Sequence, residues 1–383
     1  MLDFARQYAS IRGEILEAIT RVCDSQAFIL GPAVEAFERS AAAACSTSFA
    51  VGCASGTDAL WLALAGAGIG NSTGNGSVGD AVLTTPFSFF ASASSILRAG
   101  ARPVFADIDP RTFNLSPESA VEVLRGPAGE RIRAILPVHL YGQCADFDAL
   151  TDLGKSRGLL LLEDAAQAFG ATWQGRATGS LGVAAAFSFY PTKNLAAMGD
   201  AGLVTTSDSK IAARMRSLRT HGMTRRYYHD EIGWNARMDA IQAAVLEVKL
   251  RYLGAWTEKR RDKAAKYDEL FRGAALASSG STAHGIVLPW TDPRAEHVFH
   301  QYVIRAPRRD ALREHLTQAG IGCEIYYPVP LHLQDALADL GYRPGDFPHA
   351  EVAAREVLAL PIYPELRDGE QQAVVEAIRA FYA

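Results

Sequence analysis

The sequence lacks the features of several large protein classes. No apolar run reaches the roughly 18 residues that a membrane-spanning helix needs. The amino-terminal segment mixes both charge signs early and has no apolar core of the kind found in a secretory signal peptide. The formal net charge of the 383 residues is only −4. Composition therefore gives no reason to expect a nucleic acid or an anionic membrane as a partner, and we expect a cytoplasmic globular protein.

Cysteines are also scarce. The five that are present are scattered through the chain, and no two of them have the C-x-x-C spacing. An odd, dispersed set does not suit a disulfide framework or a zinc site. We accordingly predict no bound metal and a reducing compartment.

What the sequence does contain is an alternation of short apolar runs with helical patterns. At this length two domains are expected, because a single core stops growing at about 250–300 residues. Strands are predicted at 49–53, 81–85, 103–108, 132–138, 159–162, 184–190 and 202–206, and helices at 8–23, 33–44, 59–66, 89–99, 146–157 and 208–219. Such alternation is typical of a largely parallel, doubly wound α/β sheet. The run at 202–206 follows its predecessor so closely that we expect it to be antiparallel.

The remainder of the chain predicts a second, smaller unit. A long helical stretch runs from about 239 towards 271, with Gly254 as a possible break. After it, strands at 300–306 and 321–327 flank a helix at 310–318. We predict a large domain over 1–250 with an amino-terminal helical arm, and a small C-terminal domain over 251–383. The Gly/Ser/Asn-rich segment 70–80 is predicted to be a surface loop.

A carboxylate and a lysine end two of the central strands. Asp164 closes the leucine run at 159–162, and Lys193 follows the run at 184–190. In open α/β sheets, ligands bind at the carboxyl ends of the strands. Small and apolar residues surround Lys193 in the sequence, and desolvation would supply the free amine that a Schiff base needs. Each residue also has an ordinary alternative role. A lysine after a strand is usually solvated, and an aspartate there usually caps a helix.

The segment Ser55-Gly56-Thr57 stands at the start of a predicted helix. Ser55 suits a helix cap, with Asp58 three residues later. The same backbone N–H groups, at the positive end of the helix dipole, also suit a phosphate. A lysine, a carboxylate for a protonated ring nitrogen and a phosphate cradle together match what pyridoxal 5′-phosphate (PLP) requires.

Longer motifs then carry a family resemblance. They include FILGPAVEAFE, CASGTDAL, TTPFSFFASA, PVHLYGQ, LLEDAAQAFGA, AAFSFYPTKN, GDAG, GWNARMDAIQAA, YYPVPLHLQ and LPIYPEL. Over nearly its whole length the chain resembles the PLP-dependent sugar aminotransferases of the DegT/DnrJ/StrS group. The resemblance implies the aspartate-aminotransferase-like (type I) fold, with a mostly parallel seven-stranded sheet in the large domain and a smaller C-terminal α/β domain.

The resemblance also implies roles for individual residues around the cofactor ring. Lys193 would bind PLP covalently through a Schiff base and act as the catalytic acid and base. Asp164 would pair with the ring nitrogen, and Gln167 would reach the ring hydroxyl. Phe89 falls where the family stacks an aromatic ring on the cofactor, although core packing is the ordinary role of a phenylalanine.

The phosphate contacts implied by the resemblance come from two subunits. Gly56, Thr57 and Ser188 would hold the phosphate from within the chain. Asn235, in GWNARMD, resembles a residue that the family donates to the phosphate of the neighbouring subunit. The resemblance therefore implies a homodimer with shared active sites.

The implied reaction moves an amino group from L-glutamate to a nucleotide-linked keto-sugar, for amino-sugar biosynthesis. PVHLYGQ and the YYH…GWNARMD arrangement favour 3-keto sugars on dTDP or UDP, with 4-keto-6-deoxy sugars as the alternative. Phe169 and Tyr326 depart from the histidines of many relatives, which bears on substrate contacts. Candidate substrate-binding residues, each of which could equally be a packed or solvated side chain, are His221, Tyr228, His229, Tyr326, Tyr327 and His332.

Two rival functions use the same scaffold. PLP-dependent sugar dehydratases of this group carry histidine in place of the lysine, whereas this chain has Lys193. A non-catalytic regulatory protein could retain the fold, but every inferred cofactor contact is present here. The sequence therefore favours the aminotransferase.

Overall fold

The computed structural model describes residues 3–70 and 80–383. Most of the predicted loop at 70–80 thus lies outside the described residues. Among the described residues, seven strands form the central sheet in the order β1-β9-β8-β5-β4-β2-β3. These strands are β1 Phe49–Cys53, β2 Ala81–Thr84, β3 Arg102–Phe105, β4 Ile132–Ile135, β5 Leu160–Asp164, β8 Ala184–Ser188 and β9 Gly202–Thr206. The strands from β3 to β8 pair in parallel, and β9 runs antiparallel to both of its neighbours, as the sequence predicted.

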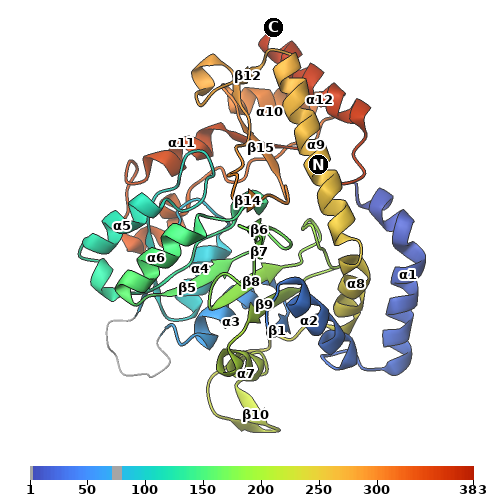
Figure 1. Cartoon of the computed structure of the whole chain (residues 1–383), viewed down its shortest axis with the longest axis vertical. Helices are drawn as coiled ribbons and strands as arrows, with labels where there is room; N and C mark the ends of the chain where they lie inside the picture. Colours follow the sequence, from blue (N-terminus) through green and yellow to red (C-terminus); the bar gives the residue numbers. More distant parts are fainter. Residues whose placement is uncertain (1–2, 71–79) are drawn as a thin grey trace.

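Helices cover both faces of this sheet (Figure 1). They are α1 Phe4–Ser25, α2 Pro32–Ala44, α3 Gly56–Gly66, α4 Ala91–Arg98, α5 Pro117–Arg125, α6 Phe147–Arg157, α7 Ser209–Leu218 and α8 Ala240–Leu250. Alternate residues of one strand enter different cores, because successive side chains of a strand point to opposite faces. Ala184 and Ala186 pack with α3, α4 and α7, whereas Ala185 and Phe187 pack with α2 and α8. The sheet is therefore covered by helices on both faces. This agrees with the continuous apolar runs of its strands, which are typical of strands buried on both sides.

The C-terminal elements lie above the central sheet in Figure 1. The long helix α9, Leu253–Gly273, leads to a four-stranded sheet of order β12-β13-β15-β16, which packs with α10, α11 and α12. The bounds are β12 Ala277–Ser278, β13 Ile286–Val287, β15 Tyr302–Arg305, β16 Val357–Leu360, α10 Arg309–Gln318, α11 Pro348–Glu356 and α12 Asp368–Tyr382. The division of the chain into domains at residue 250 stays a prediction.

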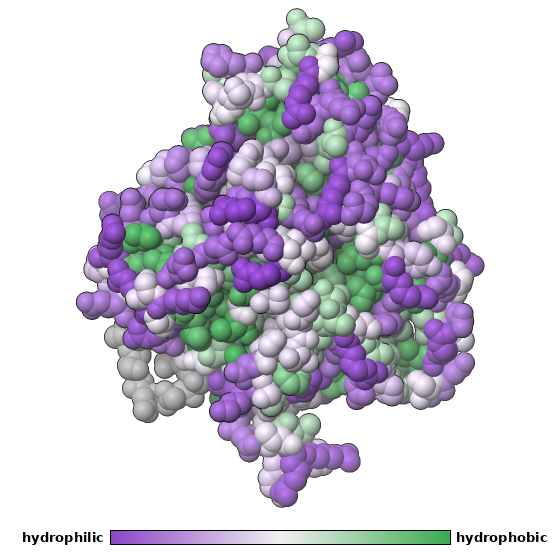
Figure 2. All heavy atoms as spheres, viewed as in Figure 1, coloured by the Kyte–Doolittle hydropathy of each residue, from purple (hydrophilic) through white to green (hydrophobic). Residues whose placement is uncertain are grey.

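Smaller elements complete the fold. A three-stranded sheet joins β14 to β6 and β7, and the hairpin β10–β11 projects at the bottom of Figure 1. Their bounds are β6 Thr172–Trp173, β7 Arg176–Ala177, β10 Met223–Arg225, β11 Tyr228–His229 and β14 Ala295–Glu296, and the 3-10 helices are η1 Gly129–Arg131, η2 Leu140–Gly142, η3 Thr282–His284, η4 Leu331–Leu333 and η5 Asp335–Leu340. On the face shown in Figure 2, hydrophobic residues gather in separate small groups between polar ones. No helix among the described residues is long and apolar enough to cross a membrane.

Two predicted elements differ in the structure. The segment 321–327 forms only an isolated bridge, Glu324 with Ala359, because the fully buried strand β16 takes the place beside β15. The long helix is interrupted at Arg251 and Tyr252, before Gly254. There the ring of Tyr252 stacks on Trp256, and its hydroxyl donates to Glu14 of α1. Tertiary contacts rather than the glycine thus set the break.

Candidate functional site

A cavity of about 660 Å³ opens where β5 and β8 end and α3 begins. It collects candidate residues that are far apart in the sequence. Its lining includes Gly56, Thr57, Phe89, Asp164, Gln167, Ser188, Lys193, Tyr326 and Tyr327. Of the eight positions predicted for the cofactor, all except Asn235 thus line one space. We call it the central cavity.

The two acidic residues at the end of β5 point in opposite directions. Glu163 is fully buried, and its carboxylate accepts hydrogen bonds from the N–H groups of Gly179, Leu181 and Gly182. It also faces His139 Nε2 at 3.2 Å. These contacts hold the backbone that follows β7. The period of two along a strand then directs the next carboxylate, Asp164, into the central cavity.

Asp164 is buried, with 3% of its surface exposed. Its Oδ2 accepts a hydrogen bond from Ser92 Oγ at 2.6 Å, and its Oδ1 accepts one from the N–H of Ala166 at 3.2 Å. Burial raises the pKa of Asp164, while these two hydrogen bonds and the charge of Lys193 oppose the rise. A cation within the cavity, such as a protonated ring nitrogen, would favour the ionised carboxylate.

Lys193 lies in the turn after β8, where its backbone N–H donates to the carbonyl oxygen of Tyr190. Burial lowers the pKa of Lys193 to about 8, and the charge of Asp164 opposes this shift. Among the described residues, no side chain or carbonyl forms a hydrogen bond with its Nζ. The chain thus holds a desolvated amine beside a buried carboxylate, which is the condition for a lysine nucleophile.

The start of α3 provides N–H groups for an anion. Ser55 Oγ caps the N–H of Asp58 at 3.1 Å, and Asp58 itself is held by Arg98 at 2.6 Å. Within the described chain, the N–H groups of Gly56 and Thr57 have no hydrogen-bond acceptor. A Cβ added to Gly56 would stand only 2.5 Å from Ser188 Cβ. Glycine is therefore needed for this close approach, and the first turn of α3 faces the cavity as an anion cradle.

Gln167 and Phe89 border the cavity on its other sides. Gln167 Oε1 accepts the N–H of Tyr141, so its Nε2 is directed to the hydroxyl of Tyr327 at 3.0 Å. Phe89 keeps 58% of its surface exposed, and its ring centroid lies 6.2 Å from that of Tyr327. A phenylalanine this exposed contributes little to the core. Its position favours the stacking role over the packing role.

The predicted substrate residues separate into three groups. Tyr326 and Tyr327 line the central cavity. His332 does not, because it is buried, with Nε2 on Glu351 at 3.1 Å. The remaining three lie exposed around the hairpin β10–β11, outside the cavity; they are His221, Tyr228 and His229.

Asn235 and Phe169 also lie away from the central cavity. Asn235 is exposed and lines a neighbouring hollow of about 450 Å³. The two spaces share Asp200. Phe169 packs in the core, with its ring centroid 4.9 Å from that of Phe187. Phe169 does not line the cavity, so the presence of phenylalanine instead of histidine at this position affects core packing.

The sequence reasoning missed several groups that line the cavity. Ser92 lies within the quoted motif TTPFSFFASA, three residues after Phe89, so the motif was an available signal. His300 and Gln301 also line the cavity, although they follow Lys193 by more than a hundred positions. No local pattern marks them.

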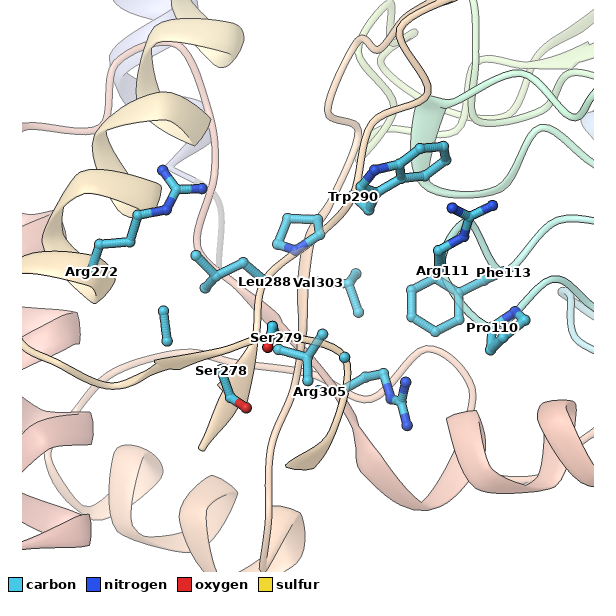
Figure 3. A pocket seen from close by; sticks show the side chains of 14 residues that line it. Pro110, Arg111, Phe113, Arg272, Ser278, Ser279, Leu288, Trp290, Val303 and Arg305 are labelled. Atoms are coloured by element: carbon cyan, nitrogen blue, oxygen red, sulfur yellow. The ribbon is translucent and has the colours of Figure 1, made fainter. Parts of the chain in front are cut away.

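Another hollow, of about 510 Å³, lies between the turn after β3 and the C-terminal sheet (Figure 3). We call it the outer hollow. Three arginines, Arg111, Arg272 and Arg305, surround its apolar floor, and the Arg111 guanidinium lies 4.4 Å from the centre of the Trp290 ring. Neither a lysine nor a carboxylate is among its described lining residues. The chemistry read from the sequence thus belongs to the central cavity.

Comparison with known proteins agrees with this geometry. The model of the DegT/DnrJ/EryC1/StrS aminotransferase family matches residues 9–379. The chain belongs to this family. It is 43% identical to the dTDP-3-amino-3,4,6-trideoxy-alpha-D-glucose transaminase of Streptomyces venezuelae, over 99% of this chain and 94% of that protein. It is 46% identical to a pleiotropic regulatory protein of Geobacillus stearothermophilus, over 100% of this chain and 98% of that protein.

A solved structure supports the same assignment. S. venezuelae DesV, in complex with a ketimine intermediate, superimposes with a TM-score of 0.91 at 42% identity, over 99% of this chain and 97% of that one. The predicted family, the α/β fold and the class of enzyme are confirmed. The chain is a PLP-dependent aminotransferase. The lysine amine, the buried carboxylate of Asp164 and the free N–H groups of Gly56 and Thr57 fit the cofactor's aldehyde, ring nitrogen and phosphate.

Proposed function

We propose that the protein transfers an amino group from L-glutamate to a nucleotide-linked 3-keto-sugar, and so makes an amino sugar. The observation that carries this proposal is the desolvated Lys193 amine beside Asp164 in one cavity. The name of the S. venezuelae relative, a 3-amino-sugar transaminase, supports the sugar class and the 3-position. Amination of a 4-keto-6-deoxy sugar is the alternative.

Each proposed residue has a task that follows from its setting. Lys193 would hold the cofactor and, when its Nζ is free, would take up and return the proton of the substrate Cα. Asp164 keeps the ring nitrogen protonated, while Gly56, Thr57 and Ser188 bind the phosphate. When bound, PLP supplies an electron sink for the electrons of the broken Cα–H bond.

The remaining proposed residues orient the ring. Phe89 stacks on it, and Gln167 reaches its hydroxyl from a carboxamide already fixed by Tyr141. Tyr326 and Tyr327 border the space left for the sugar. The cytoplasmic location expected from the sequence belongs to this proposal as well.

A panel of nucleotide keto-sugars tests the substrate. The purified protein is supplied with glutamate and with 3-keto or 4-keto sugars on dTDP, UDP or GDP, and products are identified by mass and NMR. We expect amination at carbon 3 on a dTDP or UDP sugar. Turnover of 4-keto sugars alone would overturn the 3-keto assignment, and no turnover with any of them would overturn the sugar class.

We further propose that the active enzyme is a homodimer with shared sites. Ile29, Met198 and Trp234 are large apolar side chains that are 51%, 42% and 49% exposed. Ile29 lines the same hollow as Asn235, and Met198 bonds to Gln242 of that hollow. A second copy that covers this surface would bring Asn235 to the neighbour's phosphate. The exposed residues of hairpin β10–β11, including Tyr228, could then reach the neighbour's substrate.

Mixing two inactive variants tests the shared site. Lys193→Ala and Asn235→Ala proteins are unfolded and refolded together, so that hybrid dimers pair an intact lysine with an intact asparagine. We expect the mixture to regain up to about a quarter of the wild-type activity, since half the dimers are hybrids with one complete site of two. Sedimentation measures the dimer directly. A monomeric, fully active protein would refute the proposal.

The relative named as a regulatory protein raises the question of a non-catalytic role. This chain keeps every residue proposed for the cofactor, which argues against a decayed site. Glutamate alone should convert the yellow PLP form of the purified protein to the pyridoxamine phosphate form. A protein that never absorbs as a PLP enzyme, even after the cofactor is added, would instead favour the regulatory role.

A further inference from the structure

A buried histidine lines the central cavity together with Lys193, and the chemistry described so far leaves it without a task. His300 has only 7% of its surface exposed and lies just before β15. Its Nδ1 faces Asn194, the residue after Lys193. Its Nε2 has no hydrogen-bond partner in the part of the chain that the structure describes. The two ring nitrogens are therefore in different situations.

Asn194 determines which nitrogen of His300 carries the proton. Asn194 Nδ2 donates to the carbonyl oxygen of Val298 at 2.8 Å, so the oxygen end of this side chain faces the histidine. His300 Nδ1 lies 3.3 Å from Asn194 Oδ1. A carboxamide oxygen only accepts hydrogen bonds, so Nδ1 must be the donor. In the neutral ring, Nε2 is then an acceptor.

The surroundings of His300 keep the ring neutral. Burial lowers the pKa of His300 well below its usual 6.5, and the charges of Lys193 and Arg260 lower it further, as does His297. Arg260 stays close because its Nη1 donates to the carbonyl oxygens of Phe299 and Ile362. Nε2 thus keeps its lone pair across the neutral pH range.

The free nitrogen has open space around it. His300 lines both the central cavity and a side hollow of about 260 Å³, which share Thr192, Gln301 and Tyr326. Of the described residues that line the central cavity, Lys193 is the one lysine, and no arginine is among them. Lys193 Nζ is one of the donors in this cavity that lack a partner within the described chain, and its charge acts on His300.

His139 is a buried histidine that does not line the central cavity. Its Nε2 faces Glu163 at 3.2 Å, and its Nδ1 accepts the N–H of Ala145 at 3.1 Å. Both ring nitrogens are satisfied by the chain. His300 is satisfied at one nitrogen only, and the other opens to the cavity.

We propose that His300 Nε2 accepts a hydrogen bond from Lys193 Nζ whenever that nitrogen is not bonded to the cofactor. This inference rests on the role proposed above for Lys193. When Nζ takes the proton from the substrate Cα, the Cα–H bond breaks and Nζ becomes an ammonium. A neutral acceptor stabilises that ammonium and directs it, without itself gaining a proton. Nζ then passes the proton on, and Asn194 is a positioning residue that fixes the tautomer of His300.

Two substitutions separate this role from simple packing. His300→Asn places a carboxamide nitrogen near the position of Nδ1, so the bond to Asn194 persists and the acceptor is lost. His300→Gln is one methylene longer and places a carboxamide oxygen near the position of Nε2. The proposal predicts that glutamine is the better replacement, whereas a structural tie to Asn194 predicts that asparagine is. His297→Asn is the matched control, because His297 is also buried and neutral but does not line the cavity.

Two readouts are measured on the full-length chain. In the cofactor-free protein, the pH dependence of Lys193 acylation, followed by mass spectrometry, gives the pKa of Lys193. Loss of the acceptor should lower it by about one unit in His300→Asn, since a hydrogen bond to the charged form raises a lysine pKa. In the PLP-loaded protein, the glutamate half-reaction followed by stopped-flow absorbance should slow about tenfold, the factor that corresponds to one pKa unit. His300→Gln should recover most of both values, and His297→Asn should match the wild type.

A His300→Asn protein that matches the wild type, or a His300→Gln protein that is the more impaired, would overturn the inference. If the wild type shows no glutamate half-reaction, the proposed function fails, yet the Lys193 pKa still tests His300. If the variants do not fold, ¹⁵N NMR of histidine-labelled wild type gives the tautomer. A proton on Nε2 would then overturn the inference, and a proton on Nδ1 would support it.

Discussion

The central cavity and the outer hollow are of similar size, about 660 and 510 Å³, and both place cationic side chains beside apolar ones. They differ in how their polar groups are satisfied. In the outer hollow, Arg305 pairs with Glu356 at 2.7 Å and Arg272 with Asp268 at 3.0 Å. In the central cavity, Lys193 Nζ and the N–H groups that open α3 have no partner within the described chain. Between these two cavities, the difference thus lies in the unpaired lysine amine and N–H groups rather than in size.

The central cavity and the outer hollow also differ in their cationic side chains, which are a lysine in the first and arginines in the second. An arginine stays protonated in any ordinary setting and offers no lone pair for covalent chemistry. A lysine loses its proton when burial disfavours the charge, and here the pKa of Lys193 falls to about 8. The central cavity can thus supply a nucleophile, whereas the outer hollow supplies only positive charge.

Removal of the lysine should have the largest effect. Lys193→Ala should abolish the yellow chromophore and lower the transamination rate by at least about 10³-fold, because the same side chain binds PLP and moves the proton. Absorbance spectra and product assays measure both. Lys249→Met is a matched control, since Lys249 is also buried with a pKa lowered to about 8, but it bonds to the carbonyl oxygen of Ala196. A chromophore that persists in the Lys193→Ala protein would show that Lys193 is not the residue that binds PLP.

Removal of the buried charge should have the next largest effect. Asp164→Asn keeps a side chain of the same shape but leaves the ring nitrogen without its anion. We expect the rate to fall about 10²–10³-fold, as for loss of one preorganised electrostatic contact. Stopped-flow measurement of the glutamate half-reaction gives the value. Glu163→Gln, on the adjacent residue that points away from the cavity, should instead lower the melting temperature and leave the PLP spectrum unchanged.

Filling the anion cradle should weaken cofactor binding. In Gly56→Ala the new Cβ would stand 2.5 Å from Ser188 Cβ, so the start of α3 must shift away from the phosphate. We expect the Kd for PLP to rise about 10–100-fold, since forced overpacking costs about 1–3 kcal/mol. Fluorescence titration of the cofactor-free protein measures it. Gly254→Ala, where an added Cβ meets nothing within 4 Å, should leave the Kd unchanged.

The pH should control how fast the protein captures PLP. Only the free amine of Lys193 attacks the aldehyde, so capture should accelerate as the pH rises through about 8. Between pH 7 and pH 9 the free-amine fraction rises about tenfold by simple titration. The absorbance of the forming chromophore, recorded at a series of pH values, gives the profile. A midpoint near 10.5, the ordinary lysine value, would show that Lys193 is not desolvated.

Changes in the outer hollow should have the smallest effect. Arg111→Ala removes a guanidinium that stacks on Trp290 and lies 3.5 Å from Asp109. We expect the free energy of unfolding to change by less than about 1 kcal/mol, as for other exposed pairs. Transamination rates should stay within about twofold, because no reacting group is nearby. A large loss of activity would contradict the division between the two cavities.

Much of the sheet and the centre of the site could be predicted from local patterns. Apolar runs bounded by charge located the strands, and the period of two along β5 explains why Asp164 rather than Glu163 enters the cavity. The segment 321–327 was wrongly predicted as a strand. In the structure β16 takes the position beside β15, and 321–327 keeps only one bridge to it. Competition between segments for one sheet position is not visible in either segment alone.

The roles of individual histidines could not be predicted in the same way. His332 stands in a family motif, yet the chain ties its Nε2 to Glu351 and buries it away from the cavity. His300 carries no motif signal, yet it faces the cavity beside the residue that follows Lys193. The difference depends on which partner each ring nitrogen meets after folding.

The sequence by itself determined the family, the doubly wound sheet and the strand ends that carry Asp164 and Lys193. These follow from short-range periodicity and from motifs that are continuous in the chain. Only the tertiary structure decided that Ser92 holds Asp164, that Asn194 orients His300 and that the outer hollow keeps its arginines paired. Such contacts join residues up to 106 positions apart, and packing of the whole chain fixes their geometry.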